Sequence, residues 1–325
     1  MAVVETVQGP ISVDELGVTL MHEHVFVLSA EVQQNYETEW GEEEARVEAA
    51  VARLNELAAA GVSTIVDLTV LGLGRYIPRI QRIADRTPIN IVAATGLYTY
   101  NEPPLYFHFR GPDRLLGGPE KMLEMFVRDI EIGIDDTGVK AGILKCATDE
   151  PGVTAGVERV LRAVAKAHLM TGVPISTHTF AHSRVGLEQQ RIFKEEGVDL
   201  TRVVIGHSGD TTDTDYLEEL IDNGSYIGMD RFGIDLLLPF EDRVDTVAKM
   251  CAKGYAEKMV LSHDAACHND WLDDAVVAVA TPRWNYLHIT QDVIPALLSK
   301  GVTEAQIHTM MVTNPQKIFS VQGKY

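Results

Sequence analysis

The chain has 325 residues, of which 46% are hydrophobic and 23% charged, a composition typical of a globular protein and not of a disordered or fibrous one. The net charge of −19 argues against nucleic acids and anionic membranes as partners, because the averaged field repels phosphate groups. The three cysteines form no Cys-x-x-Cys motif and no apolar run reaches the ~18 residues of a membrane helix, so we expect a soluble cytoplasmic protein without structural disulfides.

The chain begins with a predicted β-hairpin. Residues 3–7 and 11–13 are strand-like and flank Gly9-Pro10, while Gly17 precedes the first buried strand. Short apolar segments then alternate with segments of helical periodicity. The predicted strands are 18–21, 63–68, 90–95, 141–145, 174–178, 202–207, 225–229 and 258–264. The predicted helices between them are 42–60, 75–85, 119–132, 154–171, 184–196, 213–223 and 241–253.

Eight short apolar strands that alternate with helices favour an α/β fold, the (β/α)8 TIM barrel. Complete glycine fingerprints of dinucleotide-binding and P-loop folds are absent. The aromatic-bearing segment 271–286 is long, which predicts a lid or a binding loop. C-terminal helices are predicted at 290–299 and 303–311, and residues 1–325 are expected to form one domain.

His22 and His24 follow the first apolar strand. Because side chains alternate along a strand, both project to the same side, roughly 7 Å apart along the backbone, while Glu23 faces away. Two histidines at this spacing are a typical pair of metal ligands, although the pattern also arises by chance. The rest of the chain therefore has to decide between these interpretations.

The barrel predicts that catalytic residues lie at the C-terminal ends of strands. Metal-type side chains occupy five such ends: His22 and His24 at the first, Lys145 at the fourth, His178 at the fifth, His207 at the sixth and Asp264 at the eighth. Each alone has an ordinary structural explanation, but together they match the ligands that zinc and similar divalent metals prefer. The other histidines are interpreted as structural residues of loops or helices: His108, His168, His182, His268, His288 and His308. For His263 a catalytic and a structural role both stay open.

These motifs resemble the phosphotriesterase family of the amidohydrolase superfamily. The resemblance spans nearly the whole chain and rests on Leu20-Met21-His22-Glu23-His24, Gly142-Ile143-Leu144-Lys145, His178, Gly206-His207 and Ser262-His263-Asp264. It implies two divalent metal ions, with zinc expected before cobalt, iron or manganese, and a Lys145 carboxylated to N6-carboxylysine. In this arrangement His22, His24 and Asp264 hold the buried metal and His178 and His207 the exposed one, while the carbamate and a hydroxide bridge them.

Elementary chemistry agrees with that implication. An ammonium group cannot ligate a cation, so a lysine among metal ligands has to be neutral or modified. A hydroxide held between two cations forms well below the pKa of free water and supplies a nucleophile at neutral pH. Asp264 would then be a catalytic residue that accepts the proton of this hydroxide and passes it toward the leaving group.

Within the family, the chain resembles the lactonases more than the phosphotriesterases. Only 33 positions separate Arg231 from Asp264, which corresponds to the shorter loop after strand seven that lactonases have. Tyr98 and Arg231 stand where family lactonases place substrate-binding residues, although a packing tyrosine and a salt-bridged arginine are the structural alternatives. The apolar side chains after strand eight suit an acyl chain, a packed lid or a dimer contact: Trp271, Pro282, Trp284, Tyr286 and Leu287.

The resemblance thus implies a homodimeric enzyme that opens N-acyl-homoserine lactones, the chemistry of quorum quenching, and also cleaves phosphotriesters weakly. The nearest alternative is an organophosphate triesterase with the same metals. A metal-dependent deoxyribonuclease is a further alternative, because that group resembles this chain in its opening His-x-His. It has a glutamate where Lys145 stands, however, and the net charge disfavours DNA as a substrate. A non-catalytic binding barrel that lost its metals is disfavoured because all six ligand positions are filled.

Overall fold

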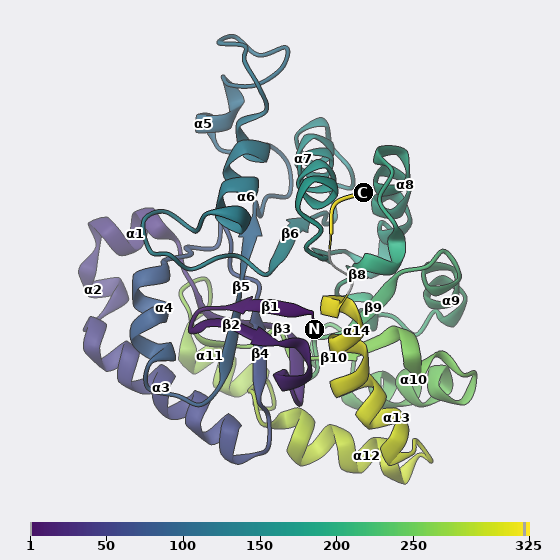
Figure 1. Cartoon of the computed structure of the whole chain (residues 1–325). Coiled ribbons are helices and arrows are strands. Elements are labelled where there is room, and N and C mark those ends of the chain that lie inside the picture. Colours follow the sequence, from purple (N-terminus) through teal and green to yellow (C-terminus); the bar gives the residue numbers. More distant parts are fainter. Residues whose placement is uncertain (1, 321–322) are drawn as a thin grey trace.

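The computed structural model describes residues 2–320 and 323–325. A parallel sheet of nine strands curls into a barrel, which confirms the predicted (β/α)8 fold (Figure 1). The strands stand in the order β10-β9-β8-β7-β6-β5-β4-β3-β11. Their bounds are β3 Thr19–Val27, β4 Thr64–Asp67, β5 Asn90–Gly96, β6 Ile143–Ala147, β7 Ile175–His178, β8 Val203–Ile205, β9 Tyr226–Met229, β10 Met259–Leu261 and β11 Ala266–Asn269.

The barrel closes through a bend between β10 and β11. Residues 262–265 connect these two strands, and their backbone bonds directly to β3: the amide of Asp264 donates to the carbonyl of His22 at 3.1 Å, and the amide of His24 donates to that of Ala265 at 2.9 Å. The eighth strand is therefore two short strands with a candidate metal ligand at the bend. β11 was not predicted, and His268 lies on it and not on a loop or helix.

Helices surround the barrel as predicted (Figure 1). Those between strands are α3 Glu43–Ala59, α4 Ile77–Ala84, α6 Lys121–Glu131, α7 Ala155–Thr171, α8 Gly186–Glu196, α9 Thr214–Asp222 and α10 Phe240–Ala252, and the C-terminal ones are α12 Ile294–Ser299, α13 Glu304–His308 and α14 Asn314–Ser320. α7 shows why they form. Thr154 caps its N-terminus by accepting from the amide of Val157 at 3.2 Å, and Gly172 ends it with φ 83°.

Five short helices among the described residues were not predicted: α1 Ala30–Asn35, α2 Glu37–Trp40, α5 Leu105–His108, α11 Asp274–Ala280 and α14, which lies beyond the predicted helix 303–311. α11 lies inside the segment 271–286, which was expected to be a loop. The side chain of Asp273 caps this helix by accepting from the amides of Ala275 and Val276. No helix among the described residues is both long and apolar enough to span a bilayer.

The hairpin of β1 Val3–Thr6 and β2 Gly9–Ser12 lies at the N-terminal end of the barrel (Figure 1). Its turn is Val7-Gln8, so Gly9-Pro10 begins β2 and is not the turn that was predicted. The amide of Val7 bonds to the carbonyl of Ile91 near the start of β5. Buried side chains of this region and of α14 pack against the inner face of the strands, namely Val4, Val13, Leu16, Ile318 and Phe319 against Val66, Val92, Ile143 and Val260. This end of the barrel is closed, which leaves the C-terminal ends of the strands for a site.

Candidate metal centre

A cavity of about 380 Å³ opens at the C-terminal ends of the strands. Its lining includes all six predicted ligands and all three predicted substrate-binding residues: His22, His24, Lys145, His178, His207, Asp264, Tyr98, Arg231 and Trp271. The residues come from β3, β6 and β7 and from the segments that follow β5, β8, β9, β10 and β11. The barrel therefore brings every one of these side chains to a single mouth.

A β-bulge in β3 sets the direction of the first two histidines. Leu20 pairs with Ile65 and Glu23 with Asp67, so three steps along β3 oppose two along β4. Met21 can then face the inner core while His22 and His24 line the cavity. The sequence predicts these histidines at the end of the first strand. In the structure they lie in the middle of the nine-residue strand β3.

Two other candidates stand beyond their strands. The sequence predicts His207 and Asp264 as the last residues of their strands. In the structure β8 ends at Ile205 and β10 at Leu261, so both residues lie on the bends that follow. Both have left-handed backbone conformations, with φ of 57° and 56°. Non-glycine residues rarely adopt such φ values, and those that do gather at functional sites.

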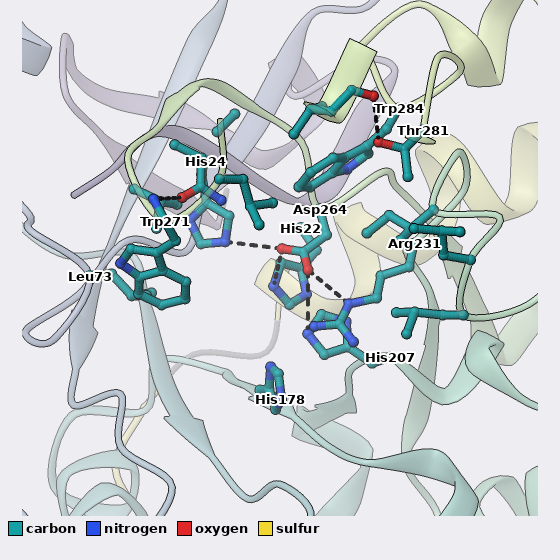
Figure 2. Close-up of a pocket in the computed structure, with 18 of the residues that line it drawn as sticks. His22, His24, Leu73, His178, His207, Arg231, Asp264, Trp271, Thr281 and Trp284 are labelled. Carbon is teal, nitrogen blue, oxygen red and sulfur yellow. Dashed lines mark hydrogen bonds and ion pairs between the residues drawn. The ribbon is translucent and has the colours of Figure 1, made fainter. Parts of the chain in front are cut away.

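Asp264 lies at the centre of the cluster (Figure 2). Its Oδ1 is 3.1 Å from Nε2 of His24 and 3.5 Å from Nε2 of His22, and its Oδ2 is 3.7 Å from Nε2 of His207. Nζ of Lys145 is 3.0 Å from Nε2 of His22. Five of the six predicted ligands therefore converge within a few ångströms.

His178 stands apart from this group (Figure 2). Its Nε2 contacts the carboxylate of Asp149, and its Nδ1 lies 3.3 Å from the hydroxyl of Tyr98. Its ring centroid is 4.5 Å from that of His207. His178 therefore lines the cavity beside the cluster, with both ring nitrogens in contact with protein groups.

Carboxylate and hydroxyl groups behind the histidines fix their ring orientations. Asp230 is buried and contacts Nδ1 of His22 at 2.9 Å and Nδ1 of His207 at 3.0 Å. Thr69 contacts Nδ1 of His24 at 2.8 Å. Each contact leaves Nε2 of the histidine directed at Asp264, which is the arrangement that orients imidazoles for a metal.

The sequence interpretation missed Asp230 and Thr69. Asp230 directly follows β9, and Thr69 lies two residues after the end of β4. The other candidates were predicted from their positions at strand ends. Asp230 also follows a strand directly, so the sequence could have predicted it in the same way. Thr69 is not a residue type that usually binds metals, and only the folded structure shows its contact with His24.

Burial favours the neutral form of three of these histidines. It lowers the pKa of His22, lowers that of His178 to about 4 against the opposing effect of Asp149, and lowers that of His207 well below its ordinary value with help from Arg231. Burial also lowers the pKa of Lys145 to about 8, although Asp264 and Asp230 oppose this shift. Neutral imidazoles have the free lone pair that a metal requires, and a partly neutral amine can be modified.

Asp264 is held ionised. Burial alone would raise the pKa of its carboxyl group, but interactions with His207, His22, His24 and Arg231 hold it well below its ordinary value. Nε of Arg231 lies 2.9 Å from Oδ2 of Asp264, and its Nη1 lies 3.1 Å from Oδ2 of Asp210. Arg231 thus contacts the central carboxylate directly and is not an isolated side chain of the substrate pocket.

Tyr98 faces the cluster across the cavity. Its hydroxyl contacts that of Tyr100, and its ring lies 6.0 Å from that of Trp271. Burial, together with Tyr100, raises the pKa of Tyr98 well above its ordinary value, so the hydroxyl remains protonated and can donate a hydrogen bond. Tyr100, which the sequence analysis did not select, also lines the cavity.

The two roles left open for His263 are decided by its contacts. Glu23 and His263 are fully buried, and Oε1 of Glu23 accepts from the amide of His263 at 2.9 Å and contacts its Nδ1 at 2.7 Å. Nε2 of His263 accepts from the amide of Ile289 at 2.9 Å. His263 therefore braces the bend before Asp264 and does not line the cavity.

Comparison with known proteins identifies the family. Residues 2–319 match the Phosphotriesterase family. The chain belongs to this family. It is 66% identical to the Phosphotriesterase homology protein of Mycobacterium tuberculosis, with all of both chains covered. It is 43% identical to the Aryldialkylphosphatase of Saccharolobus solfataricus over 94% of this chain and 96% of that protein.

A solved structure matches as well. The phosphotriesterase structure from Mycobacterium tuberculosis superposes with a TM-score of 0.98 at 66% identity and covers 99% of this chain and 100% of that one. This protein is therefore a metal-dependent hydrolase of the phosphotriesterase family with a TIM-barrel fold.

The described residues fit a metal centre. Two groups have ligand atoms within 4.8 Å of one another, His22, His24 and Asp264 in one and His22, His207 and Asp230 in the other. Imidazole nitrogen and carboxylate oxygen are donors that zinc and neighbouring divalent metals accept. The buried Lys145 lies beside them, and its amine cannot bind a metal ion while it carries a positive charge.

Proposed function

We propose that this enzyme hydrolyses lactones with an apolar acyl chain, of the N-acyl-homoserine lactone class, and that quorum quenching is its biological role. The observation that carries the proposal is the apolar wall of the cavity that also holds the histidine and aspartate cluster. The wall is formed by Ile234, Leu236, Leu237, Leu272, Val276, Val277, Ala280, Trp271 and Trp284. An acyl chain can lie on this wall while the lactone ring reaches the polar end.

Only part of the segment after strand eight contributes to this wall. Trp271 and Trp284 line the cavity, whereas Pro282 and Leu287 line a neighbouring one on the other side of α11. Tyr286 is buried, and its hydroxyl donates to the carbonyl of His24. We therefore assign the acyl-chain contacts to the two tryptophans and the aliphatic residues and leave out the other three predicted contacts.

The proposed centre holds two divalent ions, zinc first among the candidates, with Lys145 carboxylated to a carbamate. His22, His24, His178, His207 and Asp264 would supply the ligands of these ions, and Lys145 would join them once modified. When bound, the ions would lower the pKa of water and polarise the scissile carbonyl. The ligand geometry around His178 would have to change, because its nitrogens face Asp149 and Tyr98.

The protein groups divide the remaining work. The protonated hydroxyl of Tyr98 can donate to the lactone and orient its carbonyl, which stabilises charge that develops during attack. Asp264 can accept the proton of the attacking water and return it to the leaving oxygen. Arg231 keeps Asp264 ionised and oriented through their 2.9 Å contact.

A second candidate function is phosphotriester hydrolysis. It is supported by the name of the Saccharolobus solfataricus relative, Aryldialkylphosphatase. Rates measured side by side on a long-chain acyl-homoserine lactone, a simple γ-lactone and an aryl dialkyl phosphate separate the two functions. We expect the long-chain lactone to be fastest, and faster cleavage of the phosphate would reverse the assignment.

We also propose a cytoplasmic homodimer. Apolar side chains of the segment that projects from the barrel around α5 are exposed, with exposed fractions of 72% for Leu105, 83% for Leu115 and 65% for Leu116 (Figure 1). Contact with a second copy would cover them. Light scattering of the wild type and of Leu115→Glu tests this proposal, because the variant should be monomeric. The three cysteines are free and buried, which suits a reducing compartment.

A further inference from the structure

Arg243, at the end of the first turn of α10, is a fully buried arginine that the proposed chemistry does not use. Its guanidinium donates to three backbone carbonyls: Nη1 to Gly209 at 2.8 Å, Nη2 to Ile234 at 3.2 Å and Nε to Leu238 at 3.1 Å. Nη1 also lies 2.7 Å from Oδ1 of Asp210. A planar guanidinium is needed to meet partners in several directions at once, which the single ammonium of a lysine cannot do.

The segment that Arg243 holds is part of the cavity wall. Residues 232–239 connect β9 to α10 without regular structure, and Ile234, Leu236 and Leu237 within them line the cavity. Leu236 is 73% exposed and Leu237 44% exposed, so their own burial does little to fix the segment. Two of the carbonyls bonded to Arg243, those of Ile234 and Leu238, lie on either side of these leucines in the sequence. The arginine therefore clamps both ends of the stretch that faces an acyl chain.

The same arginine belongs to a row of alternating charges that ends at the centre. Asp264 contacts Arg231, Arg231 contacts Asp210, and Asp210 contacts Arg243 at 2.7 Å. All four side chains are at most 17% exposed, so solvent screens their attractions weakly. A displacement of the segment 232–239 is thereby linked to Asp210, which also positions Arg231.

An independent contact holds the outer side of the segment. Nε of Arg283 lies 3.0 Å from Oδ2 of Asp235, in an ion pair whose arginine is 47% exposed. A Cβ atom added at Gly233 would lie 2.7 Å from Cα of Trp284, so the two segments also touch directly. The outer ion pair is a natural control, because it is solvent-exposed and therefore restrains the segment only weakly, and it does not contact Asp210.

We propose that Arg243 is a positioning residue for substrate specificity, which holds Ile234, Leu236 and Leu237 in place for the acyl chain and couples them to Asp264 through Asp210 and Arg231. The proposal rests on the proposed lactonase function for its choice of substrate. A positioning role of Arg243 differs from a purely structural one in the substrates that its loss affects. A structural role affects stability and all substrates alike, whereas positioning affects long-chain substrates first.

The test compares Arg243→Lys, Arg243→Gln and the control Arg283→Gln with the wild type. KM and kcat are measured on N-butanoyl- and N-dodecanoyl-homoserine lactone, and backbone hydrogen exchange is measured over residues 232–239. For Arg243→Lys we expect KM for the dodecanoyl substrate to rise about tenfold and KM for the butanoyl substrate less than about threefold, because only the longer chain reaches the displaced wall. Exchange over 232–239 should accelerate while that of the β7 and β8 strands stays unchanged, and Arg283→Gln should change either KM less than about twofold.

Equal losses on both substrates, or unchanged exchange over 232–239, would overturn the proposal. Arg243→Gln gives the second reading if Arg243→Lys does not fold, with the same expected direction. If the wild type opens neither lactone, the lactonase assignment fails on its own. Hydrogen exchange, and the same comparison on aryl esters with acyl chains of about two and ten carbons, then decide the role of Arg243 separately.

Discussion

Nζ of Lys145 lies 3.0 Å from Nε2 of His22, so a side chain that is charged in water packs against an imidazole in the cavity. Burial lowers the pKa of both groups, to about 8 for Lys145. Because an ammonium group cannot ligate a cation, this pair suits a metal centre only when the lysine is neutral or modified. Its low pKa makes the neutral amine accessible near physiological pH.

The first prediction concerns Lys145. Lys145→Ala should lose most of its bound metal and activity, since the variant lacks the proposed bridging oxygens, while the exposed control Lys249→Ala should retain both. Metal content by elemental analysis checks this directly. A short carboxylate with carbon dioxide should restore part of the activity. Full metal occupancy in Lys145→Ala would remove the bridging role.

Asp230 supplies the second prediction. Asp230→Asn keeps the size of the side chain but weakens its contacts to Nδ1 of both His22 and His207. Metal affinity should fall about 10- to 100-fold, the usual cost of losing a partner behind a ligating histidine. Competition with a chelator measures the dissociation constant, and the exposed Asp215→Asn is the control. An unchanged constant would show that Asp230 orients neither ring.

The third prediction concerns proton transfer by Asp264. An amide can still coordinate weakly but cannot accept a proton, so Asp264→Asn should lower kcat by far more than it changes KM. Metal content has to be measured first, because loss of metal lowers kcat as well. A metal-loaded variant with normal kcat and a raised KM would contradict the proton-transfer role.

The barrel and the side chains that line its mouth could be predicted because both depend on local patterns. Alternation of apolar strands with helices predicts the barrel, and the positions of His22, Lys145 and His178 near strand ends predict that they line one cavity. The β-bulge in β3 and the left-handed φ values of His207 and Asp264 leave no sequence signal for a histidine or an aspartate. Those features are imposed by packing around the site, which is why the predicted strand ends were displaced by a few residues.

The missed elements are mostly short. β11 has four residues and only one flanking partner, β3, so its pairing is a tertiary effect that composition does not reveal. The segment of α11 does carry a helix signal, the aspartate cap Asp273 before Ala275, which the interpretation of 271–286 as a loop did not use. The lowered pKa values of His22, His178 and His207 likewise depend on burial, which only the folded chain determines.

The fourth prediction concerns stability at low pH. His168 is fully buried, with Nδ1 2.7 Å from the carbonyl oxygen of Val173 and Nε2 2.6 Å from the hydroxyl of Tyr325. Burial lowers its pKa from 6.5 to about 4. The unfolded chain therefore takes up a proton first as pH falls, so the stabilisation is present above pH 6.5 and is lost between pH 6.5 and 4.

This loss should amount to about 3 kcal/mol in the free energy of unfolding over the whole window. His168→Gln removes the titrating group, so its stability should fall less between pH 7.5 and 4.5 than that of the wild type. Urea unfolding at several pH values measures the difference, with the exposed His308→Gln as control. Parallel pH dependence in the wild type and His168→Gln would show that this histidine does not titrate differently on folding.

The last prediction tests the lactonase assignment through Tyr98. Tyr98→Phe keeps the ring, which packs 5.3 Å from that of His178, but removes the hydroxyl that is proposed to orient the carbonyl. That hydrogen bond is worth on the order of 1 kcal/mol, and more where charge develops in the transition state, so lactone turnover should fall several-fold or more. Phosphotriester turnover should change less, because its leaving group sits differently, and the exposed Tyr76→Phe should change neither. If Tyr98→Phe slowed both reactions equally, the hydroxyl would act on the metal ligands through His178 and not on the substrate, and its role in lactone selection would have to be withdrawn.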